Sequence, residues 1–217
     1  MREKFELDLN TLHTKLIEIG SLTEVALGKS IRALEKQDID LAIEVLEQDV
    51  NVDQLEEEIN DFAILLIAKQ QPVAIDLRRI IVSIKIAADI ERMADNAVNI
   101  AKSAIRIGNE PLIKPLEQIT KMHKLASEML SLSLKAYHEE DVALARKIAE
   151  IDDEVDDLYG EAIKELLQII PENLEYMNQI TQLSLVARFI ERTADHATNI
   201  AENVLYLVKG RHYALND

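Results

Sequence analysis

The segment IERMADNAVNIA at residues 90–101 is repeated as IERTADHATNIA at residues 190–201, and this repeat indicates how the chain is organised. Nine of the twelve positions are identical, and the two copies begin one hundred residues apart. A repeat of that period within 217 residues indicates two similar halves. The segment from Gly108 to Pro115 contains a glycine and two prolines, so we expect the boundary there. The predicted halves are residues 1–108 and 109–217.

The repeated segment places acids and alanines on helices. Glu91 and Asp95 stand four residues apart, as do Glu191 and Asp195, so each pair lies on one helical face about one turn apart. Beside each pair runs a stripe of small side chains, formed by Ala87, Ala94 and Ala101 in the first copy and by Ala187, Ala194 and Ala201 in the second. We therefore expect another helix to pack closely against each stripe, next to the acids.

Helical periodicity continues outside the repeat. Apolar residues recur at helical spacing, and Asp38 and Asp141 stand where they can cap the helices that follow. The pattern predicts helices at about residues 7–36, 39–70, 74–108, 116–139, 142–170 and 174–208. The run from Ile80 to Ile86 looks like a strand, but it continues into strongly helical sequence and has no partner strand. The expected fold is all-α, with two tandem three-helix bundles related by the internal repeat.

The middle helix of each half carries a second acidic pair. Asp49 and Asp53 correspond to Asp152 and Asp156 at an offset of 103 residues. The chain has 40 Asp and Glu residues, so one reading is that these pairs are solvated surface. The other reading is that the middle and last helices are antiparallel neighbours, so that four carboxylates converge and require a cation. Oxygen ligands without thiolate suit Mg, Mn, Ca or Fe, and they tolerate Zn.

The sequence lacks the signatures of several enzyme classes. It has no glycine-rich phosphate loop, nucleophile elbow or metalloprotease motif. A di-iron oxidase usually places a histidine three residues after a glutamate, and none of the five histidines stands there. His196 is either a metal ligand or an exposed or locally hydrogen-bonded side chain. Arg92 and Arg192 could bind an anion, but we expect them to form ion pairs with nearby acids. We expect no enzymatic activity; the alternative is a metal-dependent carboxylate-bundle enzyme or a metal-handling protein.

Composition and charge restrict the partners. The formal net charge of -16 argues against nucleic acid and anionic membrane surfaces as ligands. Cysteine is absent, which excludes disulfides and thiolate metal sites. The longest purely apolar run, from Phe62 to Ala68, is far shorter than a membrane span, and the N-terminus lacks the apolar core of a signal peptide. We therefore expect a soluble cytoplasmic protein that reaches a membrane only through its partners.

The doubled motif and the aspartate pairs of the middle helices resemble the phosphate-transport accessory protein family, PhoU. The resemblance covers essentially the whole chain. It implies a cytoplasmic regulator that restrains the phosphate-starvation response when phosphate is plentiful. It also implies a homodimer and two partners, namely the ATPase subunit of a phosphate ABC transporter and the cytoplasmic region of a sensor histidine kinase.

The resemblance implies metal sites as well. Some members of the family bind multinuclear iron or zinc clusters through motifs of Glu or Asp, three residues, then Asp. Carried over to this sequence, the ligands are Asp49, Asp53, Glu91 and Asp95 in the first half and Asp152, Asp156, Glu191 and Asp195 in the second. Magnesium and manganese are the alternatives to iron and zinc. The halves differ at some positions, since Asp89 corresponds to Phe189 and Glu57 to Gly160, so the two clusters need not be equivalent.

Overall fold

Helices make up nearly all of the structure, a computed structural model that describes residues 2–172 and 174–215. The helices of the described residues are α1 (Arg2–Lys36), α2 (Ile39–Gln70), α3 (Ile75–Ile107), α4 (Glu117–Glu139), α5 (Val142–Ile169) and α6 (Met177–Lys209). Two short 3-10 turns, η1 (Ile170–Glu172) and η2 (Leu174–Tyr176), lie between α5 and α6. Since these residues contain no strand, the all-α prediction is confirmed, including the strand-like run 80–86.

Cap residues explain several of the helix boundaries. The Asp38 carboxylate accepts a hydrogen bond from the Leu41 N–H at 2.9 Å, and the Asp141 carboxylate accepts one from the Leu144 N–H at 3.1 Å. These bonds satisfy N–H groups that have no partner within their own helix, so both predicted caps are confirmed. Gly210 ends α6 with a φ of 75°, a left-handed conformation that glycine adopts without a steric penalty.

Two helix starts differ from the prediction. α1 begins at Arg2 rather than near residue 7, because helical geometry extends into a polar first turn in which Glu3 faces the positive end of the helix dipole. α6 begins at Met177 rather than at residue 174, because residues 174–176 form the η2 turn. Both differences arise where the apolar pattern is weak and the local backbone decides the boundary.

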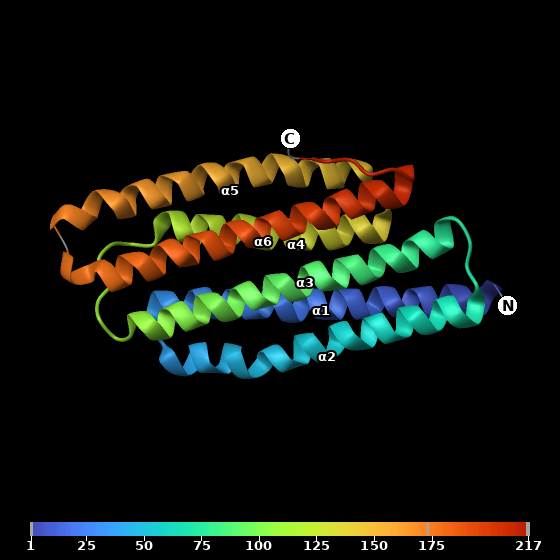
Figure 1. Cartoon of the computed structure of the whole chain (residues 1–217), viewed down its shortest axis with the longest axis horizontal. Helices are drawn as coiled ribbons and strands as arrows, with labels where there is room; N and C mark the ends of the chain where they lie inside the picture. Colours follow the sequence, from blue (N-terminus) through green and yellow to red (C-terminus); the bar gives the residue numbers. More distant parts are fainter. Residues whose placement is uncertain (1, 173, 216–217) are drawn as a thin grey trace.

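The six helices of the described residues form two bundles of three that lie side by side along their length (Figure 1). α1, α2 and α3 pack against one another, and so do α4, α5 and α6. Between the bundles, α3 packs extensively against α6, and α1 packs less extensively against α4. The predicted fold of two tandem three-helix bundles is confirmed. Within the described ranges, none of the helices combines the length and the apolar character that a bilayer span requires.

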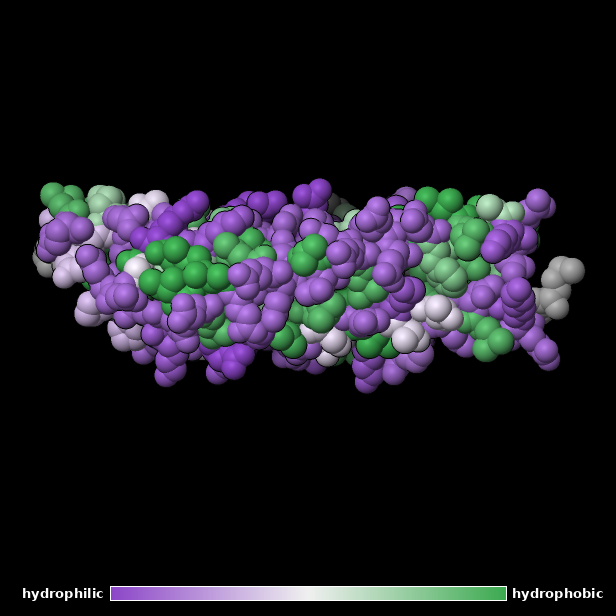
Figure 2. All heavy atoms as spheres, turned by 90° about the horizontal axis from the view of Figure 1, so that it is seen from below, coloured by the Kyte–Doolittle hydropathy of each residue, from purple (hydrophilic) through white to green (hydrophobic). Residues whose placement is uncertain are grey.

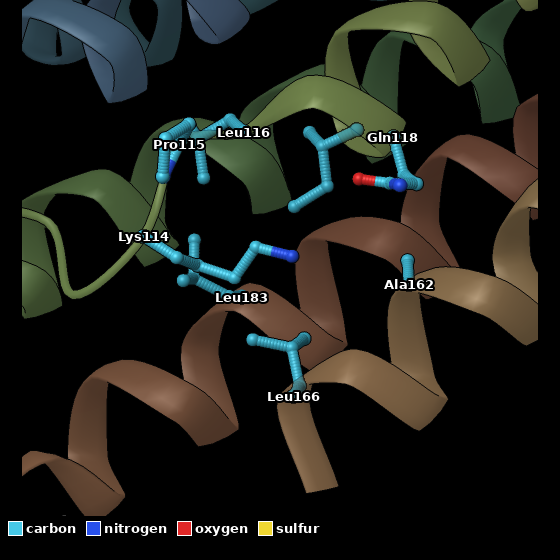
Figure 3. Close-up of a pocket in the computed structure, with 8 residues that line it drawn as sticks. Lys114, Pro115, Leu116, Gln118, Ala162, Leu166 and Leu183 are labelled. Carbon is cyan, nitrogen blue, oxygen red and sulfur yellow. The ribbon is translucent and has the colours of Figure 1, made fainter. Parts of the chain in front are cut away.

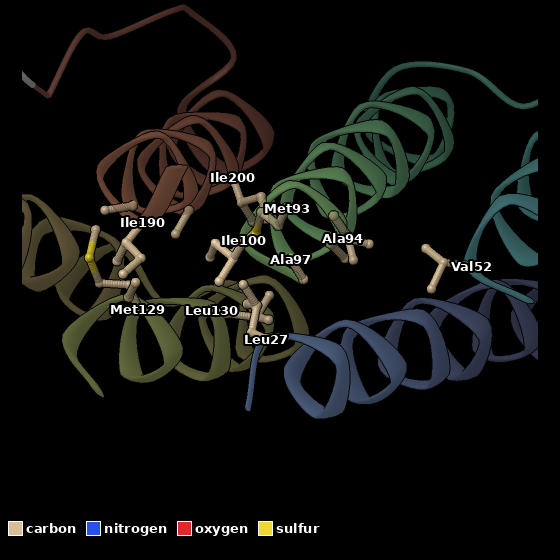
Figure 4. Close-up of a cluster of buried hydrophobic side chains, with 14 of the residues drawn as sticks. Leu27, Val52, Met93, Ala94, Ala97, Ile100, Met129, Leu130, Ile190 and Ile200 are labelled. Carbon is tan, nitrogen blue, oxygen red and sulfur yellow. The ribbon is translucent and has the colours of Figure 1, made fainter. Parts of the chain in front are cut away.

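A single hydrophobic core runs through both bundles. Figure 4 shows Met93 of α3 and Ile200 of α6 among its side chains, with Ala94 on the flank of α3 that faces Val52 of α2. Both alanine stripes predicted from the sequence are buried. Their small side chains let neighbouring helices approach closely, as expected.

The connection between α3 and α4 is held by side chains from both halves. Gln37, in the turn between α1 and α2, donates to the Gly108 carbonyl at 3.3 Å. Gln179 of α6 accepts from the Ile113 N–H at 2.5 Å and donates to the Pro111 carbonyl at 3.2 Å. The predicted boundary falls in this connection, and the division into units 1–108 and 109–217 stays a prediction.

Candidate metal centres

Each half brings its two acidic pairs together where its middle and last helices pack. These helices are α2 and α3 in the first half and α5 and α6 in the second. Burial raises the pKa of Asp49 above its usual range, and the charges of Asp53 and Asp95 raise it further. A carboxylate of α3 thus acts on a carboxylate of α2, as the sequence predicts for antiparallel neighbours.

Arg92 partly neutralises the first acidic group. Its guanidinium lies 3.5 Å from Glu91 and 3.7 Å from Asp95, so the predicted ion pairing of Arg92 is confirmed. Burial still raises the pKa of Glu91, and the charge of Asp95 adds to that shift while Arg92 opposes it. The first group therefore combines partly exposed carboxylates with one arginine at its edge.

Glu191 dominates the second acidic group because it is almost fully buried, at 9% exposure. Its Oε1 pairs with the guanidinium of Arg188, whereas its Oε2 is buried and has no hydrogen-bond partner. Burial, followed by the charge of Asp195, raises the pKa of this carboxyl to about 7 against the opposing effect of Arg188. A carboxylate oxygen removed from water without a donor favours a proton or a cation.

Asp152 and Asp156 of α5 complete the second group. Asp152 is buried, and the pKa of Asp156 is raised first by burial and then by the charge of Asp195. The charges of both aspartates contribute to the raised pKa of Glu191. The other three residues predicted for the second half therefore lie within electrostatic reach of Glu191.

The chemistry of the donors fits a hard or borderline cation. Every predicted ligand offers carboxylate oxygen, the ligand type that Mg, Mn, Ca and Fe prefer. The buried Oε2 of Glu191 is available as a ligand atom because it has no other partner. In the described part of the chain, no three acidic or histidine side chains already stand as ligands of one ion. Metal binding would thus require carboxylates to rotate inward, and the exposed side chains of Asp53 and Asp195 have room to do so.

His196 does not join the acidic group of the second half. Its Nδ1 lies 3.0 Å from Oδ1 of Asp89 on α3, and Asn199 donates to the same carboxylate oxygen at 3.3 Å. His196 is therefore hydrogen-bonded, but to a residue on another helix rather than locally, and its side chain is largely buried rather than exposed. The sequence did not indicate Asp89 as its partner, because the two residues are separated by 107 positions.

Arg188 is a second contact that sequence reasoning missed, although the signal was present. Arg188 stands three residues before Glu191, and oppositely charged residues at that spacing on a helix lie close enough to pair. In the first half the corresponding residue is Ala88, and Arg92 forms the ion pair with Glu91. The two acidic groups therefore have different arginine partners.

A pocket between α4, α5 and α6 lies apart from both acidic groups (Figure 3). Its volume of about 10 Å³ has room for a single water molecule. Its polar lining residues, Lys114 and Gln118, both bond to Glu165. The rest of its lining is apolar, namely Pro115, Leu116, Ile119, Ala162, Leu166 and Leu183. This pocket has neither the volume nor the acid–base groups of a catalytic site.

Comparison with known proteins shows the same duplicated architecture. The PhoU domain profile matches the chain twice, over residues 16–104 and 119–204. A phosphate-specific transport system accessory protein PhoU homolog from Clostridium acetobutylicum is 39% identical over 217 residues, covering 100% of this chain and 99% of the relative. A protein of the same description from Aquifex aeolicus is 40% identical over 203 residues, covering 94% of this chain and 92% of the relative.

Solved structures agree with this result. The crystal structure of PhoU from Pseudomonas aeruginosa matches with a TM-score of 0.91 and 31% identity, covering 95% of this chain and 100% of that chain. The phosphate transport system regulatory protein PhoU from Streptococcus pneumoniae matches with a TM-score of 0.90 and 29% identity, covering 96% of this chain and 99% of that chain. Since the profile matches both halves and the relatives align over nearly their whole length, this chain belongs to the PhoU family.

Proposed function

We propose that this protein regulates phosphate uptake and restrains the phosphate-starvation response when phosphate is plentiful. The observation that carries the proposal is its end-to-end similarity to proteins described as accessory or regulatory components of phosphate transport systems. Fold similarity alone would not support a shared role. The identity of 39% over the full length of both chains is the stronger support.

The protein acts as an adaptor between the ATPase subunit of a phosphate ABC transporter and the cytoplasmic region of a sensor histidine kinase. Two bundles placed side by side offer long outer faces that can serve two partners (Figure 1). The net charge of -16 opposes the capture of free phosphate, so we assign phosphate sensing to the partners. In this proposal the protein is a cytoplasmic homodimer that reaches the membrane through its partners.

The two acidic groups are proposed to hold iron or zinc, with magnesium or manganese as alternatives. The ligands would be Asp49, Asp53, Glu91 and Asp95 in one group and Asp152, Asp156, Glu191 and Asp195 in the other. A bound metal ion would neutralise the negative charges of these carboxylates. The carboxylates would then join α2 to α3 and α5 to α6. The raised pKa values of Asp49 and Glu91 and the unpartnered Oε2 of Glu191 support this role.

The observation that favours an enzyme instead is the carboxyl of Glu191, because a pKa of about 7 suits a general acid or base. We nevertheless propose no catalytic role, since relatives are described as accessory and regulatory proteins. The purified protein loaded with iron, manganese or zinc should show no phosphatase or oxidase activity above that of the free metal. Turnover that disappears in Glu191→Gln would reverse this assignment.

Gene deletion and co-purification test the regulatory role. We expect the deletion strain to express phosphate-starvation genes in phosphate-rich medium, because the restraint on the kinase is lost. We also expect the protein to co-purify with the transporter ATPase or with the cytoplasmic region of the kinase. Normal repression in the deletion strain, together with co-purification of neither partner, would assign the protein to a different pathway.

A further inference from the structure

The outer face of α2 exposes a row of large apolar side chains. Ile43, Val50, Ile64 and Leu65 are 42%, 49%, 59% and 44% exposed. At 3.6 residues per turn these positions fall within one sector of the helix, on the side away from the core. Figure 2 views the molecule from the side on which α2 lies and shows apolar areas among hydrophilic residues on this surface.

The internal repeat shows that the fold does not require this apolar face. At the offset of 103 residues, Ile43 corresponds to Arg146, Val50 to Asp153 and Leu65 to Gln168, all exposed on α5. Only the fourth position keeps an apolar residue, since Ile64 corresponds to Leu167. Two helices with the same place in their bundles therefore differ in the character of their outer faces. Because α5 carries polar residues there, the apolar residues of α2 point to a contact rather than to a demand of the fold.

The charges on α2 define the kind of partner that this face can accept. Residues 39–68 include nine Asp and Glu residues and no Lys or Arg. Glu47, Glu57 and Asp61 are exposed in the same sector as the apolar row. A second copy of the face would bring like charges together, and an anionic membrane or nucleic acid would be repelled. The partner must therefore carry positive charge beside its apolar side chains.

We propose that the outer face of α2 binds a basic amphipathic helix of another protein. Apolar side chains of that helix, three, four and seven positions apart, would pack along the row from Ile43 to Leu65, and its Lys and Arg residues would meet Glu47, Glu57 and Asp61. The row spans about 33 Å, which a partner helix of about 22 residues would cover. This inference stands apart from the regulatory role proposed above, because peptide binding in vitro requires neither a transporter nor a kinase.

A synthetic probe tests the proposal on the full chain. The probe is a labelled amphipathic peptide of about 22 residues with Leu and Ile along one face and Lys on both flanks. A second peptide has Glu in place of every Lys. The variant Ile43→Arg, Val50→Asp, Leu65→Gln gives α2 the residues of α5 and leaves the net charge unchanged. Fluorescence anisotropy should show that the wild type binds the Lys peptide and not the Glu peptide. The triple variant should bind at least about tenfold more weakly.

Two further variants test whether the peptide binds to the outer face of α2 and to its acidic residues. Leu167→Gln removes the exposed leucine from the equivalent face of α5 and should bind like the wild type. Glu47→Lys, Glu57→Lys and Asp61→Lys together should weaken binding of the Lys peptide and give a readout independent of the apolar substitutions. Equal binding of both peptides, or undiminished binding by the triple variant, would overturn the proposal. So would a wild-type dimer that the triple variant dissociates, because the occupant would then be a second copy of the chain.

Discussion

Nδ1 of His196 lies 3.0 Å from Oδ1 of Asp89, so a polar bridge joins α6 to α3 across the contact between the two halves. Both side chains are largely buried, at 17% and 16% exposure. The residues at the corresponding positions of the opposite halves are Asn96 and Phe189, which cannot form the same bridge. The contact between the halves is therefore polar on one side of the repeat and more apolar on the other.

Breaking this bridge should destabilise the protein. Asp89→Ala should lower the free energy of unfolding by about 1 to 2 kcal/mol, because it leaves the largely buried His196 without its carboxylate partner. His196→Ala should cost less, because Asp89 keeps its hydrogen bond from Asn199. Urea denaturation of both single variants and the double variant gives the coupling energy between the two side chains. The double variant Asp89→Phe, His196→Asn supplies the residues of the opposite half and should recover part of the loss. A coupling energy near zero would show that the bridge adds nothing to stability.

Glu191 should make stability depend on pH in chelator-treated protein. Its pKa is about 7 in the folded protein and near 4.5 when unfolded, so the folded state keeps a proton that the unfolded state has released. The contribution of Glu191 to the free energy of unfolding is fully present below pH 4.5 and is lost as the pH rises through 7. The loss is at most about 3 kcal/mol. Glu191→Gln removes this loss, so at pH 8 the variant should be more stable than the wild type.

Glu91→Gln is the matched control, because Glu91 occupies the same place in the first half with its side chain 25% exposed rather than 11%. At pH 8, Glu91→Gln should raise the free energy of unfolding by less than Glu191→Gln does. Chemical denaturation across pH 5 to 8 measures both variants. A wild type and a Glu191→Gln variant that lose stability in parallel over this range would contradict the buried-carboxyl interpretation.

Metal binding should raise the melting temperature of the chelator-treated protein. A metal that binds only the folded state stabilises it by about 2.7 kcal/mol at a free concentration one hundred times its Kd. Asp95→Ala together with Asp195→Ala should abolish the increase seen with iron or zinc in scanning calorimetry. Glu47→Ala together with Glu150→Ala is the control, since these exposed acids also occupy equivalent positions of the two halves outside the acidic groups. If both double variants respond to metal as the wild type does, the ligand assignment is wrong.

Three glycines inside helices should respond differently to alanine. A Cβ added at Gly28 or Gly160 meets no heavy atom within 4 Å, so each substitution should stabilise the protein by about 0.5 to 1 kcal/mol through helix propensity. At Gly20 the added Cβ would press against the Leu134 side chain of α4, so the gain should be smaller or reversed. Thermal unfolding of the three single variants ranks their stabilities. A Gly20→Ala variant as stable as Gly28→Ala would contradict the predicted ranking.

Local chemistry made most of the fold predictable from the sequence. Asp38 and Asp141 cap their helices through their own backbone neighbours, so their roles could be inferred without any long-range information. The repeat predicted that the acidic pairs lie on helices of the same bundle, but spacing alone left open whether the pairs face solvent or one another. The structure brings Asp95 of α3 within electrostatic reach of Asp49 of α2. The Asp89–His196 bridge was not predictable, because it depends on how two bundles rotate against each other. The metal content of the acidic groups stays a prediction.

Because the two bundles share one hydrophobic core, the contact between α3 and α6 resembles the interface between two subunits, but both sides belong to the same polypeptide. Two separate halves would depend on their concentration in the cell to find each other. The connection 108–116 instead keeps the halves together covalently, and its hydrogen bonds to Gln37 and Gln179 hold it against both of them. The two halves therefore stay together at any protein concentration, and every copy of the protein carries both acidic groups.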